Sequence, residues 1–294
     1  MKSDLKIEQL TLIGVGLIGG SFVLDLKRQG LVGRVVGVDV NQENLARALE
    51  RKVVDEVHSA INADSITGSE VILIATPVST LPQICTQLTP LLSSGTIVSD
   101  VGSTKQSAIE AFRSYLPDHF PYCVAAHPIA GSDRHGAMAA QFGLYQDKRL
   151  VICPHEQQDT HSVQKVEQWW QAVGAKTYQM QAEEHDAIFA AVSHMPHVLA
   201  FSYVHQIKDH PDGQEYLDFA ASGFRDFTRI ASSHPAIWRD ICLANKQSLL
   251  DLIEGQRQQL ANIESMLATE DSDGLYHYFA EAKQTRDEWL DSQI

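Results

Sequence analysis

Short apolar runs alternate with amphipathic stretches over the first 180 residues of the chain. Seven runs are rich in β-branched residues and nearly unbroken, as expected of strands covered on both faces: 9–14, 34–40, 69–77, 95–103, 122–128, 150–155 and 177–181. Between them, apolar residues recur with helical spacing at 21–29, 41–54, 79–92, 104–116 and 161–175, and Asn41 suits a helix N-cap. This alternation predicts an α/β fold with a parallel, doubly wound sheet.

The pattern changes after residue 182. Residues 183–210 form one long helical pattern that contains Pro196, and residues 238–290 are helical almost throughout, with no further strand pattern. We therefore expect two domains, 1–182 and 183–294, the second all-α. Its apolar stripes are longer than one small domain needs to cover, which favours a homodimer through the helical domain over a self-contained bundle.

Composition and charge narrow the class of protein. The 294 residues are 44% hydrophobic, and the net charge is −14 with no basic run, which argues against nucleic acid or a membrane surface as partner. The four cysteines are far apart and form no CxxC pair, as expected of reduced thiols. The first ten residues are too charged for a signal peptide, and no window approaches the roughly 20 apolar residues of a membrane helix. We expect a cytoplasmic protein.

The segment "GVGLIGGS" has the GxGxxG spacing between a strand and a helix. Gly14 allows a tight turn, Gly16 lets a pyrophosphate approach the backbone, and Gly19 allows helix and strand to pack closely. The helix then begins near Leu17 and Ile18, where free N–H groups face the phosphates. The segment predicts a Rossmann-type dinucleotide-binding domain over 1–182; a glycine turn without a ligand is the alternative.

Asp39 ends the second strand, 20 residues after Gly19. A carboxylate there accepts hydrogen bonds from ribose hydroxyls and repels a 2′-phosphate, so NAD is expected rather than NADP. Ligands of open α/β sheets lie at the carboxyl ends of the strands. We therefore expect the following loop residues to line the cofactor site: Thr76, Pro77, Val78 and Gly102.

His127 ends the fifth strand, at the same edge of the predicted sheet. A nicotinamide ring and a substrate could meet there, and a histidine with an ordinary pKa of about 6.5 suits proton transfer at neutral pH. The alternative is a buried structural histidine at a strand end. The sequence around His127 leaves both open.

Several further segments carry a family resemblance. Together with the glycine segment, "DVGSTK", "HPIAGSDRHG", "SHMPH" and "GFRDFTRIASSHPAIWRDI" resemble the prephenate/arogenate dehydrogenase family of tyrosine biosynthesis, in order from about residue 10 to 250. The resemblance is closest to the prephenate-using members. It implies an NAD(P)-dependent oxidative decarboxylation of prephenate to 4-hydroxyphenylpyruvate, in which a hydride leaves C4 of a cyclohexadienol, CO2 is lost and an aromatic ring forms. Asp39 makes NAD the expected cofactor.

The resemblance also implies residue roles. His127 would accept the proton of the C4 hydroxyl as hydride departs, and Ser103 would orient that hydroxyl. Arg229 would bind the ring carboxylate of the substrate, a bidentate task that suits a planar guanidinium. One well-placed cation would thus serve an anionic substrate within an acidic protein.

His194 and His197 lie three residues apart and would share one helix face toward the substrate. The chain has no HExxH pattern, and no cysteine lies near this pair, so we expect no metal. Histidine at position 197 favours prephenate over arogenate.

Four further positions match residues that approach the substrate, two of them by reaching the site across a dimer interface. They are Ser132, Asp133, Asp226 and Trp238. At Asp133 some family members carry a longer acid, which leaves open whether this carboxylate gates the site.

Three other functions remain open from the sequence. The substrate could be arogenate, or both compounds. A 3-hydroxyacid-type dehydrogenase also joins a Rossmann domain to a helical one, but one branch of that class uses a catalytic lysine on the helical domain, and no lysine lies between Gln181 and Gln206. A non-catalytic NAD sensor would need neither His127 nor Arg229.

Overall fold

The computed structural model describes residues 3–131 and 136–292. Its contacts divide the chain into two compact units, residues 1–246 and 247–294, and each unit is described by itself.

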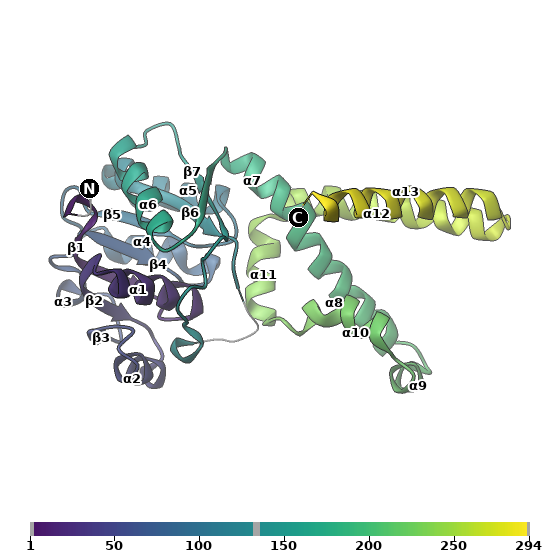
Figure 1. Cartoon of the computed structure of the whole chain (residues 1–294), viewed down its shortest axis with the longest axis horizontal. Coiled ribbons are helices and arrows are strands. Elements are labelled where there is room, and N and C mark those ends of the chain that lie inside the picture. Colours follow the sequence, from purple (N-terminus) through teal and green to yellow (C-terminus); the bar gives the residue numbers. More distant parts are fainter. Residues whose placement is uncertain (1–2, 132–135, 293–294) are drawn as a thin grey trace. The chain divides into compact units, whose positions relative to one another are not determined.

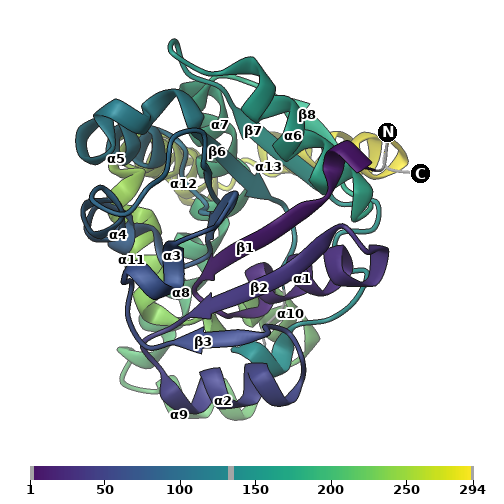
Figure 2. The same cartoon turned by 90° about the vertical axis from the view of Figure 1, so that its left-hand side faces the viewer.

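An eight-stranded sheet forms the centre of the first unit, in the order β3-β2-β1-β4-β5-β6-β7-β8 (Figure 2). All neighbouring strands are parallel except β6 and β7. The strands are β1 (Ile7–Ile13), β2 (Val32–Val38), β3 (Glu56–His58), β4 (Val71–Ile74), β5 (Ile97–Asp100), β6 (Cys123–Pro128), β7 (Arg149–Cys153) and β8 (Lys176–Gln179). The predicted fold class, a doubly wound α/β domain followed by helices, is confirmed.

Two details of the sheet differ from the prediction. The pair β6–β7 is antiparallel, because the described part of the connection between them holds only a 3₁₀ turn (Ala137–Ala139) and no crossover helix to carry the chain back. The strand β3 was not predicted, because its three residues, all half-buried, are too few to show a period.

Helices cover both faces of the sheet (Figure 1), which explains the unbroken apolar strands. On one face pack α1 (Leu17–Gln29), α2 (Gln42–Glu50) and α6 (Thr160–Ala172), against residues such as Leu10 and Leu12. On the other pack α3 (Ala63–Ile66), α4 (Leu81–Leu88) and α5 (Gln106–Tyr115). Helix α2 begins as predicted: the Asn41 side chain accepts a hydrogen bond from the backbone N–H of Asn44 at 3.0 Å.

The rest of the first unit is helical. It contains α7 (Ala182–Phe189), a π-helical turn (Ala190–His194), α8 (Met195–Lys208), α9 (Gly213–Asp218), α10 (Ser222–Thr228) and α11 (Pro235–Ala244). The first three form one continuous helix, and the widened turn precedes Pro196, which has no N–H to donate to the turn before it.

This continuous helix, residues 182–208, is long and apolar enough to cross a membrane by length and composition alone. The expectation that no segment comes near that threshold is therefore wrong. The helix nevertheless carries three buried polar side chains, His185, Asp186 and His194, which have partners inside the first unit. Core helices of soluble proteins pass the same test of composition.

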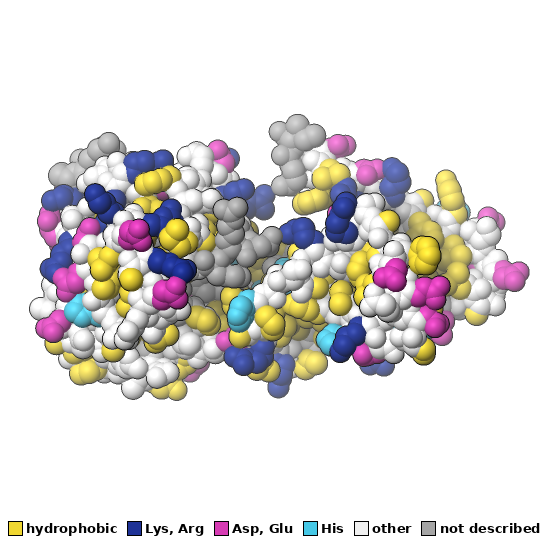
Figure 3. Space-filling view, turned by 90° about the horizontal axis from the view of Figure 1, so that it is seen from below, with side chains coloured by type: hydrophobic (Ala, Val, Ile, Leu, Met, Phe, Trp, Pro, Cys, Tyr) yellow, Lys and Arg dark blue, Asp and Glu magenta, His cyan; other side chains and the backbone are white. Residues whose placement is uncertain are grey.

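The second unit contains most of α12 (Lys246–Ala268) and all of α13 (Ser272–Asp291). The Tyr278 hydroxyl donates to Gln259 Oε1 at 3.0 Å, which links the two helices. Many large apolar side chains of the helices are exposed, and Figure 3 shows such side chains gathered on their surface. In the second unit they are Leu250, Leu260, Leu267, Tyr276, Phe279, Trp289 and Leu290.

A buried ion pair joins the ends of β5 and β6. The Lys105 side chain has no exposed surface, and its Nζ donates to Asp100 Oδ2 and to the Ala126 carbonyl, both at 2.6 Å. Asp100 also accepts the backbone N–H of Gly102 at 2.8 Å. Because both charges are out of water, neither group tolerates loss of the other.

We expect Lys105→Met to lower the free energy of unfolding by about 3–5 kcal/mol, because it leaves the buried Asp100 carboxylate without its counter-charge. Urea denaturation measures this. Lys176→Met is the matched control: its exposed pair with Asp147 spans 3.2 Å and is screened by water, so its loss should leave the urea midpoint nearly unchanged. Equal midpoints for both variants would contradict the role of the buried pair.

Candidate active site

A cavity of about 810 Å³ lies at the carboxyl ends of β1, β2 and β4. Five residues predicted to bind the cofactor line it: Gly14, Gly16, Asp39, Thr76 and Pro77. These residues come from three separate strand ends, and the parallel sheet brings them to one edge.

The three glycines of the GxGxxG segment have different structural roles. Gly14 has φ +88°, and a Cβ there would lie 2.6 Å from the Ala75 carbonyl oxygen. A Cβ at Gly19 would meet Leu12 Cδ1 and Ala75 Cβ, so this glycine lets α1 pack on the sheet. Nothing lies within 4 Å of a Cβ at Gly16. The space beside Gly16 therefore belongs to the cavity and fits a pyrophosphate.

Leu17 and Ile18, which the sequence predicts to bind the cofactor, open α1, and their side chains pack on the core. Leu17 is buried in the core, and Ile18 is partly buried against it. The Ile18 carbonyl accepts a hydrogen bond from the Tyr145 hydroxyl at 2.5 Å. The contribution open to both residues is therefore the backbone N–H at the helix N-terminus.

Asp39 is held between the glycine turn and α2. Its carboxylate accepts from the backbone N–H of Val15 (3.1 Å), the backbone N–H of Asn41 (2.9 Å) and Nδ2 of Asn44 (3.0 Å). These three donors fix the carboxylate at the wall of the cavity, where ribose hydroxyls would approach it.

Val78 and Gly102, also predicted to bind the cofactor, line a smaller space beside the main cavity. Thr76 lines both spaces. A Cβ at Gly102 would lie 2.8 Å from Val78 Cγ1 and 2.9 Å from Asp100 Oδ2. Gly102 thus keeps the ends of the β4 and β5 loops close together, and its assignment to the cofactor stays a prediction.

His127 stands at the end of β6 and contacts the first helix of the helical part. Its Nδ1 lies 2.9 Å from His185 Nε2, and His185 Nδ1 lies 2.8 Å from Asp186 Oδ1. The edge of the Phe189 ring packs on His127, with ring centroids 5.0 Å apart. Three side chains from β6 and α7 therefore form a continuous hydrogen-bonded chain.

Asp186 is anchored by the start of α5. Its Oδ1 accepts the backbone N–H of Lys105 at 2.7 Å, and its Oδ2 accepts that of Gln106 at 3.0 Å. The Asn245 side chain donates to the Asp186 carbonyl at 2.7 Å. These contacts fix α7 against the sheet and against the end of α11.

Burial strongly influences the protonation states of His127, His185 and Asp186. It lowers the pKa of His127 well below 6.5, and the nearby His185, Lys105 and His194 lower it further. Burial also lowers the pKa of His185, against the opposing effect of Asp186. Burial alone raises the pKa of Asp186, but hydrogen bonds from His185 and from the N-terminus of α5 bring it below its ordinary value. At neutral pH both histidines are therefore neutral and the carboxyl is ionised.

The predicted substrate residues form a second group. The His197 ring stacks on Trp238, with centroids 3.5 Å apart and planes inclined by 19°, and its Nδ1 donates to the Ser193 carbonyl at 2.9 Å. Burial lowers the pKa of His197, and the nearby Arg229 lowers it further. Burial lowers the pKa of His194 to about 4. The described residues contain no cluster of three His, Cys, Asp or Glu side chains suited to a metal.

Other predicted residues are not brought into this group. Asp226 is exposed on α10 and pairs with its neighbour Arg225 at 3.3 Å. Ser103 is half-buried after β5, and the described contacts include no hydrogen bond between its side chain and the strand-end histidine. Ser132 and Asp133 lie outside the described residues.

The sequence analysis missed His185, Asp186 and Lys105, all of them fully buried. One signal was present. His185 lies three residues after Ala182 and four before Phe189, so a titratable residue occupies the apolar stripe of a helix. For Lys105 no local signal existed, because its partner Asp100 is recognisable only once the strand end and the loop are folded.

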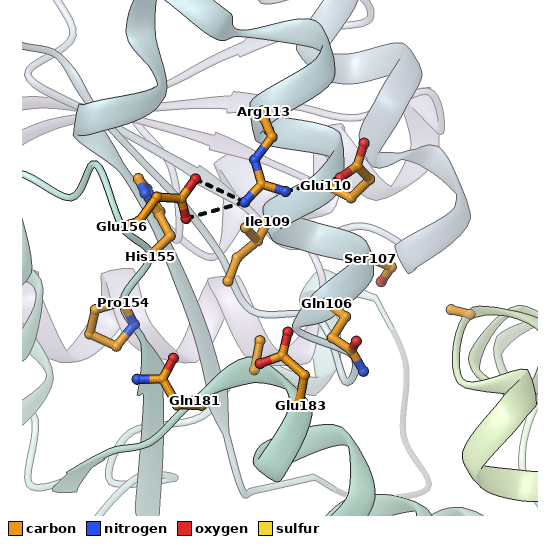
Figure 4. Close-up of a pocket in the computed structure, with 12 residues that line it drawn as sticks. Gln106, Ser107, Ile109, Glu110, Arg113, Pro154, His155, Glu156, Gln181 and Glu183 are labelled. Atoms are coloured by element: carbon orange, nitrogen blue, oxygen red, sulfur yellow. Dashed lines mark hydrogen bonds and ion pairs between the residues drawn. The ribbon is translucent and has the colours of Figure 1, made fainter.

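A second cavity, of about 690 Å³, lies between α5 and the start of α7, where Gln106 and Glu183 line it (Figure 4). Arg113 lines this cavity, and its guanidinium forms ion pairs with Glu156 and Glu110, each at 3.1 Å. None of the described residues predicted from the sequence lines this cavity, and its lining sets three carboxylates, Glu110, Glu156 and Glu183, against the guanidinium.

Two family models match the chain. The model described as prephenate dehydrogenase, nucleotide-binding domain, matches residues 22–179, and the model described as prephenate dehydrogenase, dimerization domain, matches residues 181–281. Together they cover most of both parts of the chain.

Named relatives agree with these models. The chain is 36% identical to a prephenate dehydrogenase of Bacillus subtilis, over 95% of this chain and 76% of that protein. It is 28% identical to a cyclohexadienyl dehydrogenase of Zymomonas mobilis, over 95% of each. Among solved structures it resembles the prephenate dehydrogenase of Aquifex aeolicus in complex with hydroxyphenyl propionate and NAD+, with a TM-score of 0.89, 32% identity and coverage of 96% and 98%.

We expect Gly16→Ala to weaken NAD binding at least about tenfold, because its methyl group enters the space open to the pyrophosphate. The melting temperature should not change, because this backbone (φ −107°, ψ −164°) is extended and nothing lies within 4 Å. Calorimetric titration and thermal melts measure the two effects. The contrasting variant, Gly14→Ala, should also lose stability, since its φ is +88°. Unchanged NAD affinity in Gly16→Ala would remove this glycine from the cofactor site.

Proposed function

The chain belongs to the prephenate dehydrogenase family, and on that premise we propose that it catalyses the NAD-dependent oxidative decarboxylation of prephenate to 4-hydroxyphenylpyruvate in tyrosine biosynthesis. The observation that carries the proposal is a neutral, half-buried His127 at the end of β6, at the same edge of the sheet as the glycine turn of β1. A base and a dinucleotide site at one edge suit the removal of a hydride and a proton from a secondary alcohol.

The cofactor cavity supports NAD. Gly16 leaves room for the pyrophosphate, and the Asp39 carboxylate faces the same cavity, where it suits free ribose hydroxyls and opposes a 2′-phosphate. Bound NAD supplies the acceptor for the hydride that leaves C4 of the substrate.

His127 is proposed as the general base. In neutral form it takes the proton of the C4 hydroxyl as the C4 hydride leaves, and the hydroxyl becomes a ring carbonyl. Loss of CO2 then returns an electron pair to the ring, which becomes aromatic and takes up a proton at the oxygen. Ser103 is proposed to orient the hydroxyl, from the half-buried loop after β5.

Arg229 is proposed to bind the ring carboxylate. It is exposed, and it lies close enough to lower the pKa of His197 on the α8 face. Trp238 and His194 complete this face, with ring centroids 6.1 Å apart. Asp226 is exposed within one protomer, so we propose that it approaches the site across a dimer interface. Ser132 and Asp133 follow the β6 loop and remain proposed substrate contacts.

One observation favours arogenate, or both substrates, as a second candidate. Because His197 Nδ1 donates to the Ser193 carbonyl, the neutral ring presents its Nε2 lone pair as an acceptor. An acceptor suits the ammonium of arogenate better than the keto group of prephenate. The relative from Zymomonas mobilis carries the broader name cyclohexadienyl dehydrogenase.

We also propose a homodimer in the cytoplasm. The dimerization-domain match and the exposed apolar side chains of the helices support the dimer. The four cysteines are all free thiols and three are buried, which suits a reducing compartment. The domain division at 182/183 is supported by the limits of the two family models, 179 and 181.

The test is NADH absorbance at steady state, with prephenate and arogenate offered separately and NAD or NADP as acceptor. We expect turnover with prephenate and NAD. Turnover with arogenate alone would replace the substrate and keep the mechanism. No turnover with either would contradict the proposal and favour another hydroxy acid or an NAD sensor.

We expect His127→Asn to lower kcat about 10²–10⁴-fold, the usual contribution of a general base, with NAD affinity retained. His119→Asn is the control: this half-buried histidine bonds the Thr96 carbonyl outside the site, and its loss should leave kcat unchanged.

In the protein without substitutions, we expect activity to persist at pH 6.5 and to fall at lower pH, because His127 must be neutral to act as the base and its pKa is lowered. The pH dependence of kcat measures this. An acid limb above pH 7 would contradict this assignment.

A further inference from the structure

We propose that His185 and Asp186 are positioning residues that hold His127 in the tautomer with its lone pair on Nε2, and that they receive the charge when His127 takes a proton. The inference rests on the proposed function, in which His127 is the base. It adds two residues from α7 that the motifs did not indicate.

The Asp186 carboxylate accepts two backbone N–H groups at the start of α5, at 2.7 and 3.0 Å, and its Oδ1 faces His185 Nδ1 at 2.8 Å. Asp186 is fully buried, so its charge is balanced by these donors and not by water. An ionised carboxylate only accepts, and His185 Nδ1 must therefore carry the hydrogen.

The hydrogen on His185 Nδ1 determines the next contact. A neutral imidazole has one N–H, so His185 Nε2 carries a lone pair. His127 Nδ1 lies 2.9 Å from this nitrogen and must donate to it. His127 then holds its own hydrogen on Nδ1, and its Nε2 is the basic nitrogen. The opposite tautomer would place two lone pairs or two hydrogens against each other.

The groups around His127 favour charge transfer toward α7. Lys105 faces it from the loop before α5, but this ammonium is paired with Asp100 at 2.6 Å. His194 faces it from the π-helical turn and is neutral at neutral pH, since burial lowers its pKa to about 4. The Asp100 carboxylate is therefore already neutralised by Lys105, whereas the Asp186 carboxylate faces the neutral His185 and can stabilise a charge there.

The proton path balances without any further reactant. A substrate hydroxyl proton adds to His127 Nε2, and the Nδ1 hydrogen of His127 moves to His185 Nε2. The resulting His185 imidazolium stands against the Asp186 carboxylate, while His127 returns to neutrality. The half-buried His127 ring, the buried His185 ring and one carboxylate therefore stabilise a positive charge that burial alone would oppose.

The first test compares His185→Leu with His185→Gln. Leucine removes the acceptor, and kcat should fall about 100-fold or more, with KM and NAD affinity little changed. Glutamine keeps an oxygen near the position of Nε2, so it should recover at least about tenfold of that loss by fixing the His127 ring. His119→Leu controls for loss of a half-buried histidine elsewhere, and thermal melts show that each variant is folded. Equal losses in the Leu and Gln variants, or no loss, would overturn the positioning role.

The second test reads the tautomer directly, in the NAD-bound protein with ¹⁵N-labelled histidine. The His127 signals are those that vanish in His127→Asn. We expect a hydrogen on Nδ1 and none on Nε2 at neutral pH; the reverse would overturn the inference. This readout does not depend on turnover. If the tautomer is as expected but prephenate is not consumed, the proposed substrate fails and the positioning of His127 stands.

Discussion

The carboxylate of Asp186 accepts the first backbone N–H groups of α5, and the position of the candidate base depends on this contact. The start of any helix carries N–H groups without partners and a partial positive charge. Here the Asp186 side chain of α7 supplies the acceptor. Helix α7 therefore packs against the start of α5, where unpaired N–H groups favour an anion. His185 and then His127 follow from that anchor.

Burial also resolves how an acidic chain can act on an anionic substrate. The net charge is −14, yet the charges next to the base are compensated locally: Lys105 by Asp100, and Asp186 by backbone N–H groups. Removal of either buried partner is costly, whereas exposed pairs contribute little. The exposed Arg229, which has no ion pair among the described residues, is the cation proposed to bind the substrate.

The same burial fits the chemistry to neutral pH. A base must be unprotonated to act, and the half-buried His127, whose pKa is lowered, is neutral over a wider pH range than a histidine in water. The cost is that its conjugate acid is unfavourable in the same surroundings. In the proposed arrangement the neighbouring His185 imidazole, with the Asp186 carboxylate behind it, offsets that cost.

The sequence by itself determined what depends on neighbours along the chain. Periodicity gave the α/β class, Gly14 and Gly16 gave the turn and the space for a cofactor, and Asn41 gave a helix cap. Tertiary structure decided what depends on distant partners. The β6–β7 pair is antiparallel, and the described part of its connection holds no crossover helix. His185 lies against His127 across 58 residues of chain. Residue spacing along a chain predicts local geometry. It does not predict the partner of a buried polar group, because that contact forms only when folding brings distant residues together and removes the water between them.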